Sequence, residues 1–226
     1  MQKKLKISYI LNIGIVILTI IGTIFRLTGF QFMNANKIDL VDYISPYCFF
    51  TVDSNILMGI MAFVFAVYEY RLFKDKIEYI PKSIYILKFV FTVGVVLTFL
   101  TTAFYLAPFS EYGFYPFFAN SNLFFHLIIP VLSLVTFCFF ENTDKIKYKE
   151  ICYGLVPMLI YAAFYTINGL THMKNNKVPR LYDWYGFFKA GNNSIIFVFI
   201  IMLTFTYLIC LMLWYINKKL VSNKEK

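Results

Sequence analysis

Apolar residues run through this sequence in long stretches that are separated by short polar connectors. Six of the stretches are about 20 residues long, the length that an α-helix needs to cross a hydrocarbon core about 30 Å thick. The expected spans are residues 7–25, 46–68, 84–106, 117–140, 151–170 and 194–216. The longest connectors, 26–45 and 171–193, hold too few apolar residues for a separate soluble domain. The pattern therefore predicts an all-α fold in which residues 1–226 form one bundle of six transmembrane helices.

The composition supports this class of fold. Hydrophobic residues make up 60% of the chain and aromatic residues 21%, more than soluble domains usually contain. Lys3, Lys4 and Lys6 precede the first apolar run, as in a secretory signal, but the run is long for such a signal and no small-residue cleavage site follows it. We expect the run to remain as the first helix of a multi-pass protein of the cell membrane.

Lys and Arg residues near the helix ends predict the orientation, because these residues are retained mainly on the cytoplasmic side. With the N-terminus inside, the inner segments hold fourteen of them: Lys3, Lys4, Lys6, Arg71, Lys74, Lys76, Lys82, Lys145, Lys147, Lys149, Lys218, Lys219, Lys224 and Lys226. The outer segments hold six: Arg26, Lys37, Lys174, Lys177, Arg180 and Lys189. The bias predicts that both termini are cytoplasmic. Lys88, near the inner end of the third span, is expected to extend its ammonium group to the membrane interface.

The net charge of +9 points to lipid and not to nucleic acid. The cations are spread over the loops that flank the membrane, and they form no patch among exposed aromatic residues of the kind that binds nucleic acid. Anionic lipid head groups are their expected partners. The four cysteines show neither zinc-ligand spacing nor a disulfide framework, and no cofactor motif is present. We expect neither a metal nor a cofactor.

Two of the spans open alike, with Phe-rich turns followed by Asn and Ser. Residues 50–57 match residues 117–124 in this way, and the last span opens similarly. The likeness is either a faint repeat of two-helix units or the ordinary preference of helix N-termini for these residue types. We favour helix capping, because short matches of this kind arise easily in a single sequence.

The second span carries polar residues that should be buried. If Pro46 lies in the first turn, Thr51, Asp53 and Asn55 lie roughly 8 to 14 Å into the helix. A carboxylate at that depth is costly unless it faces the bundle interior, is protonated or finds a partner. Arg26 is the expected partner for a structural tie to Asp53, and a functional role for Asp53 is the alternative.

The fourth span contains the histidine that stands closest to the middle of any apolar stretch, His126. Asn122 lies one helical turn before it, where its amide could orient the imidazole. Pro130 lies one turn after it and has no N–H, so we expect the carbonyl of His126 to lose its helical partner and the helix to kink. Such a kink makes room for water or substrate. A histidine that only ties two helices together is the structural alternative.

Thr51 shares a face of the second span with Asn55, and Ser54 lies beside them. In the functional interpretation, His126 takes the proton of the Thr51 hydroxyl, which attacks an acyl carbon. Asn55, Asn122 or Ser121 would then stabilise the oxyanion. In the structural interpretation, the Thr51 hydroxyl bonds back to a carbonyl one turn earlier.

The chain resembles the androgen-induced-gene-like family of six-span membrane proteins and its bacterial relatives. The resemblance rests on the order and number of the helices and on four motifs: Phe50-Thr51-x-x-Ser54-Asn55, Asn122-x-x-x-His126-x-x-x-Pro130, residues 157–169, and the aromatic segment 181–187. Animal members of that family are threonine hydrolases that cleave fatty acid esters of hydroxy fatty acids inside the membrane. The resemblance implies that Thr51 is the nucleophile and His126 the base.

The resemblance also suggests how substrate and water would reach this pair. A lipid ester would enter sideways between Phe-lined helices. Water would come through the polar outer ends of the spans, along a path lined by Tyr165, Asn168 or Asn193. The loop 171–193, whose Trp184 and Tyr185 suit the membrane interface, could cover the path.

Two other classes of function fit the same residues. In a small transporter or sensor, Asp53 or His126 would bind a proton or cation, although no charged track crosses the inner half of the expected bundle. In a noncatalytic scaffold, all three polar residues would serve stability alone. The sequence does not fix the oligomeric state or the identity of the lipid.

Overall fold

The computed structural model describes residues 2–35, 46–141, 146–188 and 192–221. These residues form helices joined by turns, and the described part of the chain contains no β-strand beyond one isolated bridge. Six helical segments are long and apolar enough to cross a membrane: Gln2–Thr28, Phe50–Phe73, Lys82–Leu106, Ser121–Phe139, Tyr148–Thr171 and Ser194–Leu220. The all-helical fold expected from the apolar pattern, with six helices that could span a membrane, is therefore confirmed.

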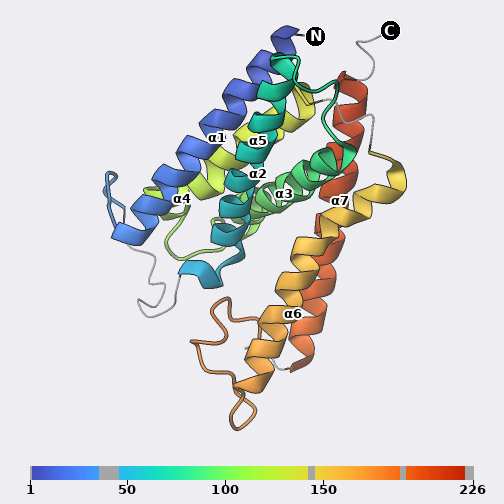
Figure 1. The fold of residues 1–226 in the computed structure, drawn as a ribbon. Coiled ribbons are helices and arrows are strands. Elements are labelled where there is room, and N and C mark those ends of the chain that lie inside the picture. The colour runs from blue at the N-terminus through green and yellow to red at the C-terminus, as the bar shows by residue number, and fades with distance from the viewer. Residues whose placement is uncertain (1, 36–45, 142–145, 189–191, 222–226) are drawn as a thin grey trace.

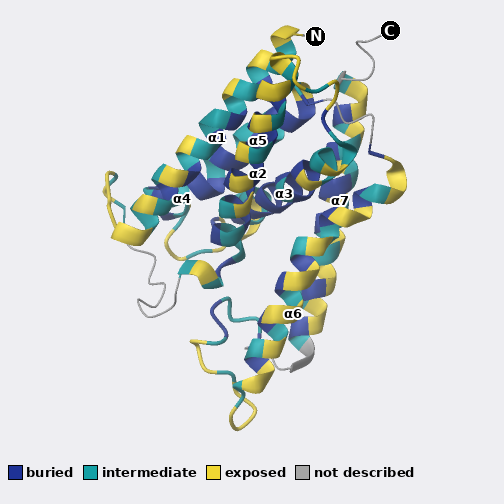
Figure 2. Ribbon diagram, viewed as in Figure 1, coloured by how far each residue is buried: buried dark blue, intermediate teal, exposed yellow. Residues whose placement is uncertain are grey.

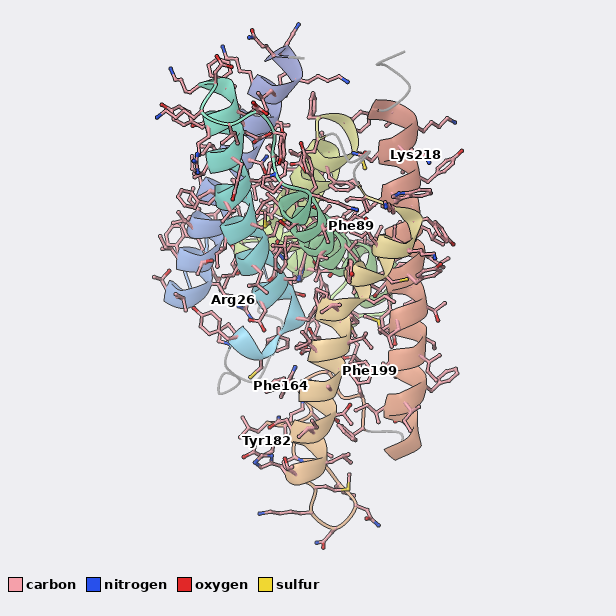
Figure 3. The ribbon with its side chains drawn as sticks, turned by 45° about the vertical axis from the view of Figure 1, so that its right-hand side comes forward. Arg26, Phe89, Phe164, Tyr182, Phe199 and Lys218 are labelled. Carbon is pink, nitrogen blue, oxygen red and sulfur yellow. The ribbon has the colours of Figure 1, made fainter. Side chains whose placement is uncertain are left out.

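The first described helix begins at the end of the bundle where the last described helix ends. The N-terminus of α1 (Gln2–Thr28) and the C-terminus of α7 (Asn192–Val221) lie together at the top of Figure 1. We call this the terminal end, and we call the opposite end, with Thr28 and Phe50, the loop end. Lys218 marks the terminal end in Figure 3, where it packs over the Trp214 ring at 4.8 Å. That the terminal end faces the cytoplasm stays a prediction from the Lys and Arg counts.

The packing is tightest around α3 (Lys82–Thr101), which continues to Leu106 as a π-helix. Half or more of the residues in the spanning parts of α2 (Phe50–Phe73), α3 and the fourth span are buried, against 28% in α1, α6 and α7. Figure 2 shows the resulting buried centre and the alternation of exposed and buried residues along α6 and α7. Exposed Ile and Phe side chains on these outer helices are expected for contact with lipid.

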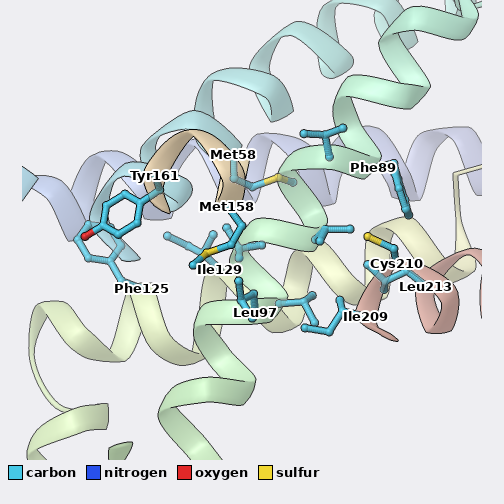
Figure 4. Packing of buried hydrophobic residues seen from close by; sticks show 14 of the residues in the cluster. Met58, Phe89, Leu97, Phe125, Ile129, Met158, Tyr161, Ile209, Cys210 and Leu213 are labelled. Carbon is cyan, nitrogen blue, oxygen red and sulfur yellow. The ribbon is translucent and has the colours of Figure 1, made fainter. Parts of the chain in front are cut away.

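The core joins residues from all six spans. Met58 of α2, Leu97 of α3 and Ile129 of α5 (Ile129–Phe139) lie close together in Figure 4. Small residues bring the helices near one another. A Cβ atom on Gly59 of α2 would lie only 2.6 Å from the Thr19 side chain of α1, so any larger residue there would push the two helices apart.

The second span begins later than the sequence predicted. Pro46–Cys48 form a separate 3₁₀ turn, and α2 begins at Phe50 with Phe49 as its N-cap. Thr51 and Asp53 therefore lie in the first turn of the helix, and the depth of 8 to 14 Å expected from a start at Pro46 is wrong. The extended backbone of Phe49 interrupts the helix between the two segments. The expected cap, Ser45, lies outside the described residues.

The fourth span is not the continuous helix that was predicted over 117–140. It consists of a 3₁₀ turn (Tyr115–Phe118), a single turn α4 (Ser121–Leu123), a π-helix (Phe124–Ile128) and α5. Asn120 causes the break, because its φ of 55° does not continue a helix. Its side chain accepts hydrogen bonds from the backbone N–H groups of Phe32 and Met33, both at 2.8 Å. The connector after α1 thus holds Asn120 in this conformation.

Side-chain capping does not explain the similar openings of the second and fourth spans. Neither Phe49, which caps α2, nor Asn120, which caps α4, forms a side-chain hydrogen bond to its helix. Asn120 nevertheless stands at the N-cap of α4 and Asp53 in the first turn of α2, positions that these residue types prefer. The side chains at the start of α7 lie outside the described set.

The last two spans run side by side toward the loop end (Figures 1 and 3). A 3₁₀ segment (Tyr148–Leu155) leads into α6 (Val156–Thr171), which packs against α7. Between α6 and α7 runs an open apolar groove of about 430 Å³, lined by residues that include Leu159, Ala163, Phe199 and Leu203.

Candidate functional site

His126 lies in the π-helical segment of the fourth span, with 9% of its surface exposed. Its Nδ1 is 2.7 Å from the carbonyl oxygen of Phe117. A carbonyl only accepts, so Nδ1 carries the proton and Nε2 is left as the basic nitrogen. The Phe118 ring meets the imidazole edge to face, at 6.4 Å between ring centroids. These contacts fix both the tautomer and the orientation of the ring.

The position of Asn122 one turn before His126 had suggested that its amide orients the imidazole. It does not. Its amide donates instead to the carbonyl of Pro116 at 3.1 Å. The carbonyl of the next residue, Phe117, takes the place beside the imidazole that was expected for the amide. Ser121 is buried, and its side chain forms no hydrogen bond with another described residue.

Pro130 also leaves a second carbonyl, that of Phe125, without a backbone donor. In a π-helix each carbonyl accepts from the N–H five residues later, and Ile129 accordingly donates to Phe124. The next carbonyl, that of Phe125, would need the N–H that Pro130 lacks. Asn55 of α2 fills this gap, since its Nδ2 lies 3.0 Å from the Phe125 oxygen.

Asn55 thus ties the second span to the segment that carries the histidine. Its Nδ2 also donates to the carbonyl of Thr51 at 2.7 Å, which uses both amide hydrogens. Ser54 donates to the same carbonyl at 3.2 Å. Neither residue is placed to stabilise an oxyanion, because their donors are committed to the backbone. The Oδ1 atom of Asn55 is buried without a partner.

The hydroxyl of Thr51 faces the loop between α6 and α7. Burial raises the pKa of Tyr185 to about 12, against the effect of the neighbouring Tyr161 hydroxyl, Phe50 backbone and Thr51 hydroxyl. Among the described residues, the Thr51 hydroxyl forms no hydrogen bond to a carbonyl one turn earlier, which the structural interpretation had expected. No hydrogen bond joins Thr51 to His126, although both residues are described.

Arg26 does not pair with Asp53. The described residues form two salt bridges, and neither includes Arg26 or Asp53. The Arg26 Nε atom is buried without a partner, at the C-terminal end of α1 (Figure 3). Arg26 interacts electrostatically with His126, which it approaches because α1 packs against the fourth span. The expected tie between Asp53 and Arg26 is therefore wrong. The carboxylate of Asp53 lies in the first turn of α2, where it is half-exposed and forms no hydrogen bond with another described residue.

The loop between α6 and α7 packs over the loop end. Trp184 is only 2% exposed and donates to the Tyr161 hydroxyl at 2.9 Å, which in turn donates to the carbonyl of Cys48 at 2.7 Å. The Tyr165 hydroxyl donates to Asp183. The Trp184 ring, which the sequence suggested would suit the membrane interface, is enclosed against Tyr165, at 4.8 Å between ring centroids.

Two of the three residues expected along a water path can be located. Tyr165 is fully buried under the loop and lines no open path. Asn168 is half-exposed, and its carbonyl accepts from the Thr171 hydroxyl at 3.0 Å. The side chain of Asn193 lies outside the described set.

A second group of polar residues, which the sequence interpretation missed, lies at the terminal end. Lys88 of α3 is completely buried and donates to Asn12 of α1. Its ammonium is 3.4 Å from Glu141, which follows α5, and Glu69 of α2 lies 3.1 Å from the Asn12 amide. The prediction that Lys88 reaches the interface is wrong, because these partners hold it inside. We call Asn12, Glu69, Lys88 and Glu141 the terminal-end cluster.

The sequence held a weak signal for this cluster. Glu69, Lys88 and Glu141 each stand near the end of an apolar stretch, where charged residues usually reach the interface. Asn12, in contrast, stands well inside the first span. A polar residue at that depth needs a partner from another helix, and this was the available clue.

No known family model, curated protein or solved structure matches this chain. Among the described residues, no three His, Cys, Asp or Glu side chains stand close enough together to hold a metal ion.

Proposed function

We propose that this protein is an intramembrane hydrolase of lipid esters, with Thr51 as the nucleophile and His126 as the base. The observation that carries the proposal is the bond from His126 Nδ1 to the Phe117 carbonyl at 2.7 Å. A base needs one ring nitrogen held by an acceptor, so that the other keeps its lone pair in a fixed direction. The resemblance to a family of threonine hydrolases supports the same two residues.

The reaction takes place in two steps. In the first, the Thr51 oxygen attacks the acyl carbon as His126 Nε2 takes the hydroxyl proton, and the proton then passes to the departing alcohol oxygen. In the second, water attacks the acyl-threonine ester, His126 again takes and returns a proton, and the fatty acid leaves. The first step requires the Thr51 hydroxyl to exchange Tyr185 for His126.

Arg26 is the best donor for the oxyanion. Asn55, expected in this role, has no free amide hydrogen. The unpartnered Nε of Arg26 supplies a positively charged donor near His126. Such a donor stabilises negative charge more strongly than a neutral amide does.

The groove between α6 and α7 supports a lipid substrate. Its wall is almost wholly apolar, and Phe199 on that wall meets the Tyr165 ring edge to face at 6.1 Å. The backbone N–H of Tyr185 donates to the Tyr165 hydroxyl at 3.3 Å, and Tyr185 in turn contacts Thr51. One acyl chain in this groove would therefore lie next to the residues that surround the nucleophile.

The test is labelling of the purified protein in lipid nanodiscs with a fluorophosphonate probe. We expect the wild type and Thr51→Ser to react, and Thr51→Ala and His126→Asn to lose at least nine-tenths of the label. Thr136→Ala is the matched control, because Thr136 is a buried helical threonine of the fourth span whose hydroxyl bonds to Leu132 at 2.6 Å. Unchanged labelling of a folded Thr51→Ala variant would remove Thr51 as the nucleophile.

Transport or sensing of a proton or cation is the second candidate function. The terminal-end cluster favours it, because the inner half of the bundle does contain charged residues, contrary to the sequence interpretation. Asp53 at the loop end would then be the entry or exit site. Uptake into liposomes that follows a pH gradient, is lost in Asp53→Asn and is unchanged in Thr51→Ala would replace the hydrolase proposal with this one.

A further inference from the structure

The terminal-end cluster joins four spans in a space that is closed to solvent. Asn12 and Lys88 are 0% exposed, Glu69 is 1% exposed and Glu141 is 2% exposed. They come from α1, α3, α2 and the residues just after α5, respectively. Charged groups buried in this way are costly unless every charge is balanced and every oxygen has a donor.

The hydrogens of the Asn12 amide are too few for the oxygens that it faces. Lys88 donates to Oδ1 of Asn12, which fixes the orientation of the amide, and the Ser8 hydroxyl of α1 interacts with Glu69. The Asn12 Nδ2 faces four oxygens: the Ser8 carbonyl at 3.1 Å, the Ser8 hydroxyl at 3.4 Å, Glu69 at 3.1 Å and Glu141 at 3.2 Å. An amide nitrogen carries only two hydrogens. The second carboxylate oxygen of Glu141 is buried with no partner at all.

The charges also fail to balance. One lysine faces two carboxylates, so the fully ionised cluster carries a net charge of −1. The other groups that face it are neutral: the Tyr85 hydroxyl of α3, the Cys138 thiol of α5 and the Phe65 ring, which lies 5.5 Å from the Lys88 ammonium. On α7, the Asn217 amide donates to the backbone carbonyl of Glu141 at 2.7 Å.

One added proton corrects both deficits. A protonated carboxyl is neutral, and its O–H is a further donor for a neighbouring oxygen. Glu69 and Glu141 both lie within 3.2 Å of the same amide nitrogen, so they are close enough for one to influence the ionisation of the other. Burial raises the pKa of Glu141, against the attraction of Lys88.

We propose that the terminal-end cluster is a binding site for one proton, which Glu69 and Glu141 share while Lys88 stays charged. This site is independent of Thr51 and His126 and goes beyond the proposed hydrolase activity. Binding converts one carboxylate to a carboxylic acid, and release restores it. Because the cluster links α1, α2, α3 and α5, release of the proton leaves an unbalanced buried charge and weakens the contact among these helices.

The test is infrared spectroscopy of the full chain in lipid nanodiscs at pH 7, in H₂O and in D₂O. We expect a carboxylic acid C=O band equivalent to one protonated carboxyl. The band should vanish in Glu69→Gln and in Glu141→Gln, because Lys88 then faces a single ionised carboxylate. It should persist in the control variants Asp53→Asn and Glu150→Gln, which remove carboxyl groups elsewhere.

Lys88→Met adds a check that does not depend on the glutamine variants. Without the cation both carboxyls should be protonated, and the band should double. Absence of the band in the wild type would overturn the proposal, as would a band of two carboxyls, which would mean that Lys88 is neutral. Loss of the wild-type band on addition of sodium at constant pH would show that a metal cation, and not a proton, balances the charge.

Discussion

The loop end and the terminal end of this bundle both contain buried polar residues, but these residues find their hydrogen-bond partners in different ways. At the loop end, His126 and Asn55 bond to backbone carbonyls that a break in the helix has left free, at 2.7 and 3.0 Å. At the terminal end, Lys88, Glu69 and Glu141 bond to one another and to Asn12. The first two bonds join neutral groups, whereas the second arrangement contains one cation and two carboxylates.

This difference indicates different roles. A neutral imidazole with a fixed orientation is suited to proton transfer during a reaction. A closed cluster with an unbalanced charge is suited to holding one proton, with an effect on how the helices pack. The variants below test the contrast between the two ends, from the largest expected effect to the smallest.

Lys88→Met should have the largest effect on stability. It removes the only cation among the described residues of the terminal-end cluster, so we expect a loss of about 3–5 kcal/mol in the free energy of unfolding at pH 7. The loss should shrink as the pH falls, because the carboxylates then become protonated. Chemical unfolding in detergent at several pH values measures both the loss of stability at pH 7 and its change with pH.

The matched control for this variant is Lys82→Met on the same helix. Lys82 forms a salt bridge to Glu150 at 2.6 Å, but 36% of its side chain is exposed. Exposed pairs contribute about 0–1 kcal/mol. Equal losses in the two variants would contradict the view that burial distinguishes the terminal-end cluster.

Asn55→Ala should be the most damaging change at the loop end. It leaves the Phe125 carbonyl without a donor, and an unpaired buried carbonyl costs about 1–3 kcal/mol. Asn168→Ala is the control, because the half-exposed Asn168 side chain forms no hydrogen bond, and its loss should stay within about 0.5 kcal/mol. If thermal unfolding does not separate the two variants, the π-helical segment does not depend on Asn55.

The pH dependence of stability should come from the terminal end. Since the pKa of Glu141 is raised above its ordinary value of 4.5, the folded state binds more protons than the unfolded state above that pH. Its contribution to stability is therefore complete below pH 4.5 and is lost as the pH rises through the folded pKa. The slope should not exceed about 1.4 kcal/mol per pH unit. Glu141→Gln should flatten it, and a slope unchanged in that variant would place its origin elsewhere.

Asp53→Asn should have the smallest effect. The Asp53 side chain is half-exposed and forms no hydrogen bond with another described residue, and its interaction with the N-terminus of α2 contributes about 0.3–1 kcal/mol. We expect a loss below about 1 kcal/mol in thermal unfolding and no change in fluorophosphonate labelling. A larger loss would mean that Asp53 has a partner that the structure lacks.

The apolar pattern was enough to predict that the chain is all-helical with six potential spans, because the length of an apolar run depends on nearby residues alone. Composition likewise indicated a membrane protein. The same local information showed that Thr51, Asn55 and His126 are polar residues inside two apolar helices. It could not show where breaks fall inside a span, since the break at Asn120 depends on backbone groups of Phe32 and Met33, far away in the sequence.

The tertiary structure alone decided which polar groups meet. The sequence paired Asp53 with Arg26, His126 with Asn122, and Lys88 with the interface. In the structure, Arg26 lies near His126, Phe117 orients the imidazole, and Lys88 is closed in with Glu69 and Glu141. The physical reason is that a partner depends on how helices pack and rotate against one another. That arrangement is set by many small contacts, such as Gly59 against Thr19, which no single stretch of sequence contains.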